Sequence, residues 1–393
     1  MPSVLSLFSG AGGIDLGLEA AGFDLVGAIE LDPNARKTLA LNRPGWPLLE
    51  PSDVFEFAEL VHPSTLGLKL GELDLLVGGP PCQPFSKAAQ WQSTGRRGTR
   101  DERASCIDAM ARVAAKLHPK LILVENVPGF VRRPNSGLAR LEHQLADVHR
   151  SSGVRYRLHS TVLRAEEYGV PQLRQRGVVV AVREDLARPF EWPKRVPLTD
   201  QRRAGDALFG LRVAAPPAAS GRWATLLPSI PAGSNYMFHT PDGGGEPLFG
   251  ARTRFWSFLL KLHPARPAWT LPASPGPGTG PFHWDSRPLA VDEMARLQTF
   301  PLGWRFEGTQ HVGVRQVGNA APPLLVEHIG RALMTTLGKA PPPDIVHAIA
   351  KQKVLAVAPR RRKVPVDFES RRAAHPRHEG TGMGPRPRDT RVG

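Results

Sequence analysis

The stretch Val4-Leu5-Ser6-Leu7-Phe8-Ser9-Gly10-Ala11-Gly12-Gly13 (VLSLFSGAGG) decides the fold of this chain. A short apolar run, 4–8, leads into a glycine-rich turn, and a helical pattern follows at 14–21. Three further apolar runs, at 24–30, 73–77 and 121–127, alternate with helical patterns at 33–42 and 104–117. This alternation predicts an α/β fold with a doubly wound, mostly parallel sheet. Runs at 156–163 and 178–183 are expected to extend the sheet, one of them as an antiparallel edge.

Distinctive residues follow each of the first four predicted strands. They are the glycine-rich turn, Glu30, the loop Pro80-Pro81-Cys82, and Glu125-Asn126. Because ligands of such sheets bind beyond the carboxyl ends of the strands, we expect these residues at one edge. Glu30 follows Gly10 at the spacing, roughly 20 residues, at which a carboxylate binds ribose hydroxyls. On these residues alone NAD and S-adenosylmethionine both fit, and turn glycines beside a surface Glu are the plain alternative.

The charge of the chain indicates a polyanionic partner. Its net charge is +15 and its pI about 10.5, and residues 351–393 hold twelve Lys and Arg against four Asp and Glu. This Pro- and Arg-rich end is predicted to be disordered and basic, with weak attraction to phosphates as its functional interpretation. The remainder of the chain is still basic enough to suit nucleic acid.

The chain has two cysteines, which rules out a disulfide framework. Cys82 and Cys106 lie far apart in the sequence with no paired histidines, so we expect no metal site. Cys106 lies in a helical pattern and is interpreted as packing. Cys82 lies in the glycine- and proline-rich loop VGGPPCQPFS (77–86), where a small apolar side chain at a turn is the alternative interpretation. A cysteine that acts with a Glu and an Arg suggests covalent catalysis on an electron-poor ring.

In the order of its motifs the chain resembles the DNA (cytosine-5)-methyltransferase family, of the bacterial restriction-modification or orphan type. The resemblance runs over nearly all of residues 4–335. The matching pieces are LFSGAGG (7–13), Glu30, Asp53, GGPPCQPFS (78–86), ENV (125–127), QLRQR (172–176) and RQVGNAAPP (315–323). The resemblance implies a Rossmann-like methyltransferase sheet that uses S-adenosylmethionine, with a small, loop-rich target recognition domain.

The chemistry explains the residue types at the catalytic positions. Cytosine C5 is a poor nucleophile, and addition of a thiolate to C6 makes it reactive, so Cys82 is the expected nucleophile. Glu125 is expected to protonate N3, provided that burial keeps its proton near neutral pH. The resemblance assigns the cytosine O2 to Arg176, with Arg174 supporting it; a solvated strand is the alternative for that segment. The group that removes the C5 proton is not named by the sequence.

For the cofactor, the resemblance implies a pocket for S-adenosylmethionine. Glu30 is expected to bind the ribose and Asp53 the adenine amino group. Asn319 is expected to close the pocket by bringing the C-terminal helix back against the first strand. The expected cofactor-binding residues are Phe8, Ser9, Gly10, Gly12, Gly13, Glu30, Asp53, Pro80 and Asn319.

The partner implied is double-stranded DNA with a flipped-out cytosine, because a stacked base cannot enter a pocket at the edge of a sheet. The basic segment 86–103 is predicted to close over the DNA, a plain surface loop being the alternative. Residues 184–270 correspond to the target recognition region, where Arg252, Arg254 and Asn235 are candidates for base contacts. The other expected DNA-binding residues are Ser86, Lys87, Arg96, Arg97 and Arg100.

The predicted organisation is a catalytic and cofactor-binding domain at 1–183, the target recognition region at 184–270, a scaffold segment with the returning helix at 271–338, and a basic, Pro- and Arg-rich tail at 339–393 that is expected to be disordered. No apolar run approaches the ~20 residues of a membrane span. The two cysteines favour a reducing compartment, and the sequence gives no sign of a stable oligomer, so we expect a cytoplasmic, nucleoid-associated monomer. A restriction endonuclease is a possible functional partner.

Three rival functions remain open from the sequence. One is methylation of tRNA, although a tRNA enzyme of this kind has less between QLRQR and GN than the interval 184–270 provides here. Another is a DNA-binding protein without catalysis, which has no need of Cys82, Glu125 and Arg176. A nicotinamide oxidoreductase explains only the start of the chain, as far as Glu30.

Overall fold

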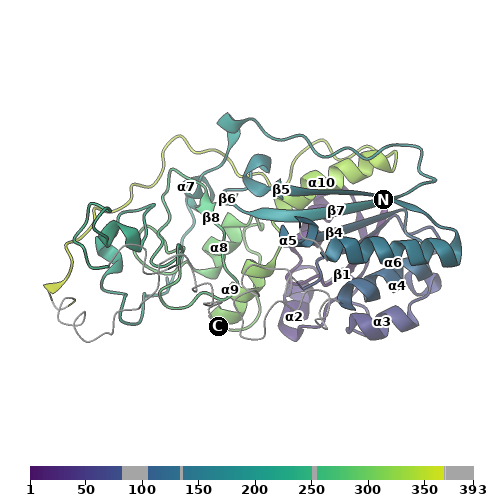
Figure 1. The fold of residues 1–393 in the computed structure, drawn as a ribbon, viewed down its shortest axis with the longest axis horizontal. Coiled ribbons are helices and arrows are strands. Elements are labelled where there is room, and N and C mark those ends of the chain that lie inside the picture. Colours follow the sequence, from purple (N-terminus) through teal and green to yellow (C-terminus); the bar gives the residue numbers. More distant parts are fainter. Residues whose placement is uncertain (82–104, 133–135, 250–254, 367, 369–393) are drawn as a thin grey trace, which may run out of the picture.

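The computed structural model describes residues 1–81, 105–132, 136–249, 255–366 and 368. These residues form two parts that lie side by side along the long axis of the molecule (Figure 1). One part is a sheet with helices on both faces. The other part, the described residues of 209–288, consists mainly of loops, and we call it the second lobe.

The described sheet has six strands in the order β2-β1-β3-β4-β7-β5. Strands β1 to β4 are parallel, whereas β7 runs antiparallel to both of its neighbours. The antiparallel strand therefore lies inside the sheet rather than at the expected edge, because β7 returns along β5 and inserts between β5 and β4. The bounds are β1 Ser3–Leu7, β2 Asp24–Ile29, β3 Leu75–Gly78, β4 Leu121–Asn126, β5 Tyr156–Arg164 and β7 Gln175–Arg183.

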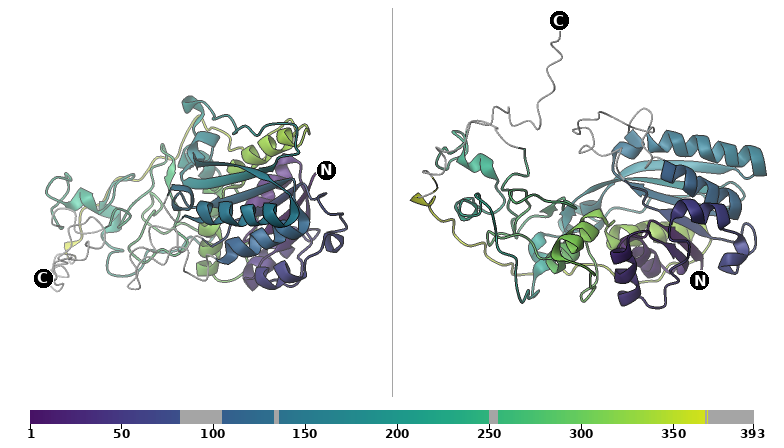
Figure 2. Two further views of the ribbon diagram at one scale, coloured as in Figure 1. Left: turned by 45° about the vertical axis from the view of Figure 1, so that its right-hand side comes forward. Right: turned by 90° about the horizontal axis from the view of Figure 1, so that it is seen from below.

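Helices cover both faces of the sheet, which confirms the predicted doubly wound α/β fold (Figure 2). Helices α1 (Gly13–Ala21) and α10 (Pro323–Thr336) pack together on one face. Helices α3 (Val54–Leu60), α4 (Ser105–Leu117) and α6 (Gly137–Ser152) cover the other, and α2 (Pro33–Asn42) follows β2. Successive strand residues face opposite sides, so Val4 packs toward α1 whereas Leu5 packs toward α4. The C-terminal helix thus returns to the first helix of the chain.

Short elements connect the sheet to the second lobe. A buried hydrophobic cluster that includes Trp284, Leu297 and Phe300 packs these short elements against α1. The connecting elements are α7 Ala204–Leu208, α8 Val291–Leu297, α9 Gln310–Asn319, and the paired strands β6 Gln172–Leu173 and β8 Ala268–Trp269, whereas the short helix α5 Gly129–Arg132 packs on the sheet beside α6. Single 3-10 turns lie at Pro63–Leu66, Ala165–Tyr168, Leu198–Asp200, Leu227–Ser229 and Tyr236–His239.

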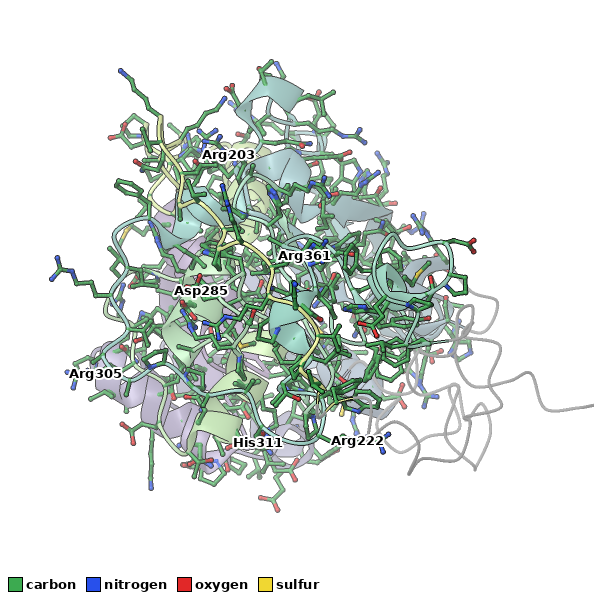
Figure 3. The ribbon with its side chains drawn as sticks, turned by 90° about the vertical axis from the view of Figure 1, so that its left-hand side faces the viewer. Arg203, Arg222, Asp285, Arg305, His311 and Arg361 are labelled. Carbon is green, nitrogen blue, oxygen red and sulfur yellow. The ribbon has the colours of Figure 1, made fainter. Side chains whose placement is uncertain are left out.

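The second lobe has its own aromatic core. The rings of Trp223, Tyr236, Phe249 and Phe258 contact one another in this core, and Phe368 from the C-terminal part of the chain is buried among them. Figure 3 looks onto the outer end of this lobe, where Arg222 and Arg361 are labelled. A lobe with few helices and strands is therefore held by ring packing.

Residues 339–366 form an extended strap, which we name for its course. It leaves α10 and runs along the molecule to the far end of the second lobe (Figure 1). Val346 and His347 donate backbone hydrogen bonds to the buried carboxylate of Glu327, and Arg362 donates one to Pro228. The expectation of a disordered segment from 339 onward is therefore wrong for 339–366. The basic composition of this part of the chain did not indicate that apolar side chains such as Ile349 pack into the core.

Candidate active site

The carboxyl ends of the four parallel strands lie at the same level of the sheet. Leu7 is paired with Ile29 on β2 and with Gly78 on β3, and Gly78 is paired with Val124 on β4. The residues that follow each strand therefore share one edge, as the sequence predicted. This edge brings together the glycine-rich turn, Glu30, the segment Gly79-Pro80 and Glu125.

The glycine-rich turn leads directly into α1. Phe8, Gly10 and Gly12 have positive φ values of 58°, 56° and 83°, so the backbone here turns sharply. Gly12 is the N-cap of α1 and provides no side chain to accept a hydrogen bond from the first turn. The first N–H groups of the helix therefore remain suited to an anionic group of a ligand.

Glu30 closes the glycine-rich turn. Its carboxylate accepts hydrogen bonds from the Gly10 N–H at 2.6 Å and from the Asp32 N–H at 2.7 Å. Burial raises the pKa of Glu30, and those two N–H groups oppose the shift. Each carboxylate oxygen has a further lone pair, so the group can still accept a hydrogen bond from a ligand hydroxyl.

Phe8 and Ser9 begin the same turn, and Pro80 follows β3, whose last residue Phe8 contacts. The Phe8 ring lies against Gly78, and the buried Ser9 hydroxyl donates to the Ser6 hydroxyl at 3.0 Å. The side-chain amide of Asn126 donates to the Pro80 carbonyl at 2.9 Å, within the buried interior. Asn126 therefore holds the loop that leads from β3 toward Cys82, a role that the sequence analysis did not assign to it.

Glu125 and Arg176 form a buried ion pair between β4 and β7. Arg176 Nε lies 2.6 Å from Glu125 Oε1, and both side chains are 11% exposed. Burial raises the pKa of Glu125, and the guanidinium of Arg176 opposes the shift. The second Glu125 oxygen faces Gly79, because a Cβ placed on that glycine would lie 3.6 Å from Oε2. The pair therefore borders the loop that leads to Cys82.

Arg174 makes different contacts from those that the sequence predicted. Among the described residues its guanidinium donates to the carbonyls of Gly318 and Ala320, both at 2.9 Å, and not to Glu125 or to a group beside Arg176. Its side chain is 1% exposed. The support expected for Arg176 is therefore corrected, because Arg174 is directed into the core beneath α9. Asn319, between the two carbonyls, is exposed.

Asp53 is the N-cap of α3, where its side chain accepts a hydrogen bond from the Phe55 N–H at 2.8 Å. It lies close enough to Cys106 to raise the pKa of that thiol. Burial is the larger cause, and together they raise the pKa of Cys106 to about 11. Cys106 is thus a buried thiol with little thiolate at neutral pH, in agreement with the packing interpretation.

Asn235 does not fit its expected role in base contact. It is 3% exposed, accepts a hydrogen bond from the Met237 N–H and donates one to the Trp256 carbonyl. Its amide stabilises the turn at Tyr236–His239 in the interior of the second lobe. Polar composition in a Pro- and Gly-rich segment therefore did not distinguish a turn cap from a base contact.

Several expected site residues lie outside the described residues. They are Cys82, Ser86, Lys87, Arg96, Arg97, Arg100, Arg252 and Arg254. Their roles stay predictions from the sequence.

Asp15 is a polar residue that the sequence analysis missed. It lies in the first turn of α1, is 2% exposed, and neither carboxylate oxygen has a hydrogen-bond partner among the described residues. Burial raises its pKa to about 7, and the nearby Ser6 hydroxyl opposes the shift. A carboxylate at an apolar position of a helical pattern was the available indication of an unusual environment.

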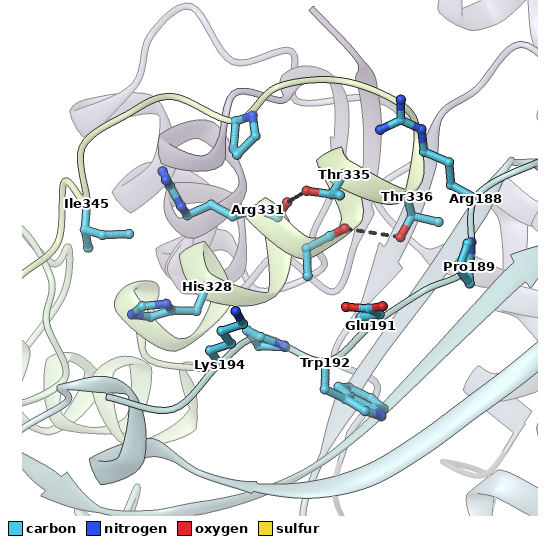
Figure 4. A pocket seen from close by; sticks show the side chains of 13 residues that line it. Arg188, Pro189, Glu191, Trp192, Lys194, His328, Arg331, Thr335, Thr336 and Ile345 are labelled. Carbon is cyan, nitrogen blue, oxygen red and sulfur yellow. Dashed lines mark hydrogen bonds between the residues drawn. The ribbon is translucent and has the colours of Figure 1, made fainter. Parts of the chain in front are cut away.

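A cavity of about 590 Å³ lies away from this edge, between residues 188–194 and the C-terminal half of α10 (Figure 4). Its lining includes Arg188, Trp192, Lys194, His328 and Thr335. None of the residues predicted for the site lines it, so the cavity is separate from the strand ends.

In the described residues, no helix has both the length and the apolar character needed to cross a membrane.

Comparison with known proteins shows which protein family the chain matches. The chain matches the family model described as C-5 cytosine-specific DNA methylase over residues 3–211 and 277–335. It is 36% identical over 376 residues to the Type II methyltransferase M.SacI of Streptomyces achromogenes, covering 85% of this chain and 93% of that protein. It is 35% identical to the Type II methyltransferase M.Eco47II of Escherichia coli, covering 86% and 80%.

Solved structures share the fold. The TM-score is 0.60 to a prophage-encoded E. coli protein described as a DNA modification methyltransferase, at 24% identity and covering 86% of this chain and all of that chain. It is also 0.60 to DNMT2 of Spodoptera frugiperda, at 16% identity and covering 85% and 100%. These likenesses concern the fold alone. The interval without a family match, 212–276, falls within the second lobe.

Proposed function

The chain belongs to the C-5 cytosine-specific DNA methylase family and is a DNA cytosine-5-methyltransferase; on that premise we propose that it methylates C5 of a flipped-out cytosine within a short sequence of double-stranded DNA. We propose further that it is the modification enzyme of a restriction-modification system and acts as a monomer. The observation that carries the proposal is the buried Glu125–Arg176 pair, which borders the loop toward Cys82 at the same edge as the glycine-rich turn.

In this proposal Cys82 is the nucleophile. Its thiolate adds to C6 of the cytosine, and the electrons of the C5–C6 bond move toward N3, which takes up a proton. Asn126 supports this role because it fixes the Pro80 carbonyl two residues before Cys82. After methylation C5 loses its proton to a base that we do not assign, N3 returns its proton to Glu125, and elimination restores the C5–C6 double bond and the thiolate.

Glu125 and Arg176 act on the ring. The raised pKa of Glu125 keeps its carboxyl group protonated to a higher pH than an exposed Glu, so that it can protonate N3. Arg176 stays charged and can donate to O2 without losing a proton. Their mutual contact holds both groups at the strand ends before the base arrives.

S-adenosylmethionine, when bound, supplies an electrophilic methyl group. The residues at the strand ends fit such a group: the uncapped start of α1 suits its carboxylate, and Glu30 can accept from ribose hydroxyls. Asp53 has a second carboxylate oxygen for the adenine amino group. The exposed Asn319 is proposed to close the pocket together with Phe8, Ser9 and Pro80.

For DNA recognition we propose the organisation expected from the sequence. Residues 184–270 form the target recognition region, with Arg252 and Arg254 toward bases. Ser86, Lys87, Arg96, Arg97 and Arg100 contact the DNA backbone. The interval 212–276, between the two stretches that match the family model, supports this division, since a region outside the part shared by the family suits recognition of a particular sequence.

The test is bisulfite sequencing of genomic DNA from a methylation-deficient bacterium that expresses the chain. We expect protected cytosines within one short sequence. Cys82→Ser should abolish protection because the hydroxyl is a far weaker nucleophile. Cys106→Ala is the matched control and should retain protection, because that thiol is buried.

Two results would contradict the proposal. Protection with Cys82→Ser would remove the thiol from the reaction. Absence of protection with a soluble, folded wild-type chain would instead favour tRNA as substrate, to be tested by bisulfite sequencing of RNA, or a binding protein without catalysis.

A further inference from the structure

Arg174 is a charged side chain enclosed by the protein. It is 1% exposed and forms no ion pair with any described residue. A buried charge without compensation strongly destabilises a fold, so its surroundings must provide equivalent interactions. Arg174 and Arg176 belong to one sequence motif, but their side chains make contacts at different places.

The C-terminus of α9 compensates the charge. Helix α9 ends at Asn319, and the carbonyls of its last residues have no partner within the helix. Two of the carbonyls at this end, those of Gly318 and Ala320, accept hydrogen bonds from Arg174 Nη2. The partial negative charge at this end of a helix further favours a guanidinium.

A second buried side chain reinforces the same helix end. Gln298 donates to the carbonyls of Val317 at 2.9 Å and Ala320 at 3.3 Å. Gln172, two residues before Arg174, donates to the Gln298 side chain at 3.1 Å. Gln172 and Gln298 are both fully buried. The segment 172–174 therefore holds the turn 317–320 through a connected network of polar side chains.

The turn held by Arg174 contacts the glycine-rich turn. A Cβ placed on Gly13 would lie 2.3 Å from the Ala321 carbonyl and 3.2 Å from the Ala320 Cβ. The start of α1 therefore rests directly on residues 320–321. On the other side, Arg174 is two residues from Arg176, which is paired with Glu125.

We propose that Arg174 is a positioning residue that couples the two halves of the site. It fixes the end of α9, and with it Asn319 and the start of α1, at a set distance from the strand that carries Arg176. Its role toward the cofactor side rests on the proposed function, in which S-adenosylmethionine occupies the glycine-rich turn. Arg174 then supports binding of the cofactor and Arg176 binding of the cytosine, although both belong to one motif.

The two arginines can be separated with the full-length chain by calorimetric titration of S-adenosylhomocysteine. Lysine keeps the charge, but its side chain is one bond shorter, so Nζ does not reach the position from which Arg174 Nη2 donates to both carbonyls. We expect its Kd for S-adenosylhomocysteine to rise about tenfold, the loss of roughly one charge-assisted hydrogen bond. Its single-turnover rate with saturating S-adenosylmethionine should stay close to that of the wild type.

Arg176→Lys is the matched control within the motif. It should leave the Kd for S-adenosylhomocysteine unchanged and lower the single-turnover rate. Arg157→Lys, an exposed position on β5, should change neither quantity. If Arg174→Lys does not fold, Gln298→Met removes the other donor to the same carbonyls at similar volume and should raise the same Kd about threefold.

The Kd for S-adenosylhomocysteine tests the positioning role of Arg174. If wild type binds S-adenosylhomocysteine and Arg174→Lys, or Gln298→Met in its place, binds it equally well, the positioning role of Arg174 is wrong while the proposed function stands. If the wild-type chain binds no S-adenosylhomocysteine, the proposed cofactor and the coupling are both wrong. A tenfold rise in Kd confined to Arg174→Lys supports the coupling.

Discussion

At the scale of single residues, Glu125 and Arg176 meet because β4 and β7 are antiparallel. Glu125 is paired with Val178, so Arg176, two residues earlier on β7, is its diagonal neighbour on the same face of the sheet. Long side chains reach each other at that spacing. Each motif on its own indicated a polar strand end, and the contact between the motifs depends on the register of strands that are far apart in the sequence.

Asp15 supports a prediction about stability and pH. Its pKa is raised to about 7 in the folded chain, against an ordinary value of 3.8. The folded state therefore binds a proton more tightly than the unfolded state. Stability from this group is fully present below about pH 4 and is lost as the pH rises through about 7, on the order of 2–4 kcal/mol.

Asp15→Asn should remove this dependence. We expect the variant to gain stability relative to the wild type as the pH is raised from 4 to 8, measured as the free energy of unfolding in urea. The control is Asp24→Asn, at an exposed position at the start of β2. Equal differences between Asp15→Asn and wild type at both pH values would show that the folded chain does not hold Asp15 protonated.

At the scale of elements, the start of α1 is restricted by the turn between α9 and α10. Gly13→Ala would place a Cβ 2.3 Å from the Ala321 carbonyl, a backbone atom that cannot move aside cheaply. We expect a loss of about 1–3 kcal/mol in the free energy of unfolding. Because α1 must shift, the affinity for S-adenosylhomocysteine should also fall, as measured by calorimetric titration.

Gly45→Ala is the matched control, since a Cβ on Gly45 would have no atom within 4 Å. It should change neither stability nor affinity beyond a few tenths of a kcal/mol. If Gly13→Ala behaves like Gly45→Ala, the contact between the start of α1 and Ala321 is looser than the structure indicates, and the coupling inferred for Arg174 loses its path to the cofactor.

At the scale of the whole molecule, the strap joins the sheet to the second lobe. Near α10 its backbone satisfies the carboxylate of Glu327, which is fully buried. Near α7 the Gln352 N–H donates to Asp206 at 2.8 Å. Beyond its far end, Phe368 packs against Trp223. The family match ends at residue 335, so the strap lies beyond the matched part of the chain.

A chain that ends after Gly338 should therefore be less stable by about 3 kcal/mol or more, because Glu327 loses two charge-assisted hydrogen bonds and the aromatic core loses Phe368. Urea denaturation would measure the change. A chain that ends after Phe368 keeps every described contact and should unfold at the wild-type midpoint. Identical midpoints for the two truncations would mean that the strap contributes nothing to the fold.

Much of the fold and part of the site could be predicted from the sequence by itself. The alternation of apolar runs and helical patterns determined the doubly wound sheet, and the motifs at strand ends determined that the glycine-rich turn, Glu30 and Glu125 share one edge. These properties depend on residues close together in the chain, where backbone preference and periodicity act.

Only the tertiary structure decided the pairing of Glu125 with Arg176, the burial of Arg174 under α9, the buried turn of Asn235 and the course of the strap. The physical reason is that each of these joins segments far apart in the sequence. Their meeting depends on the packing free energy of the whole molecule, to which a local pattern of polar or basic residues contributes little information.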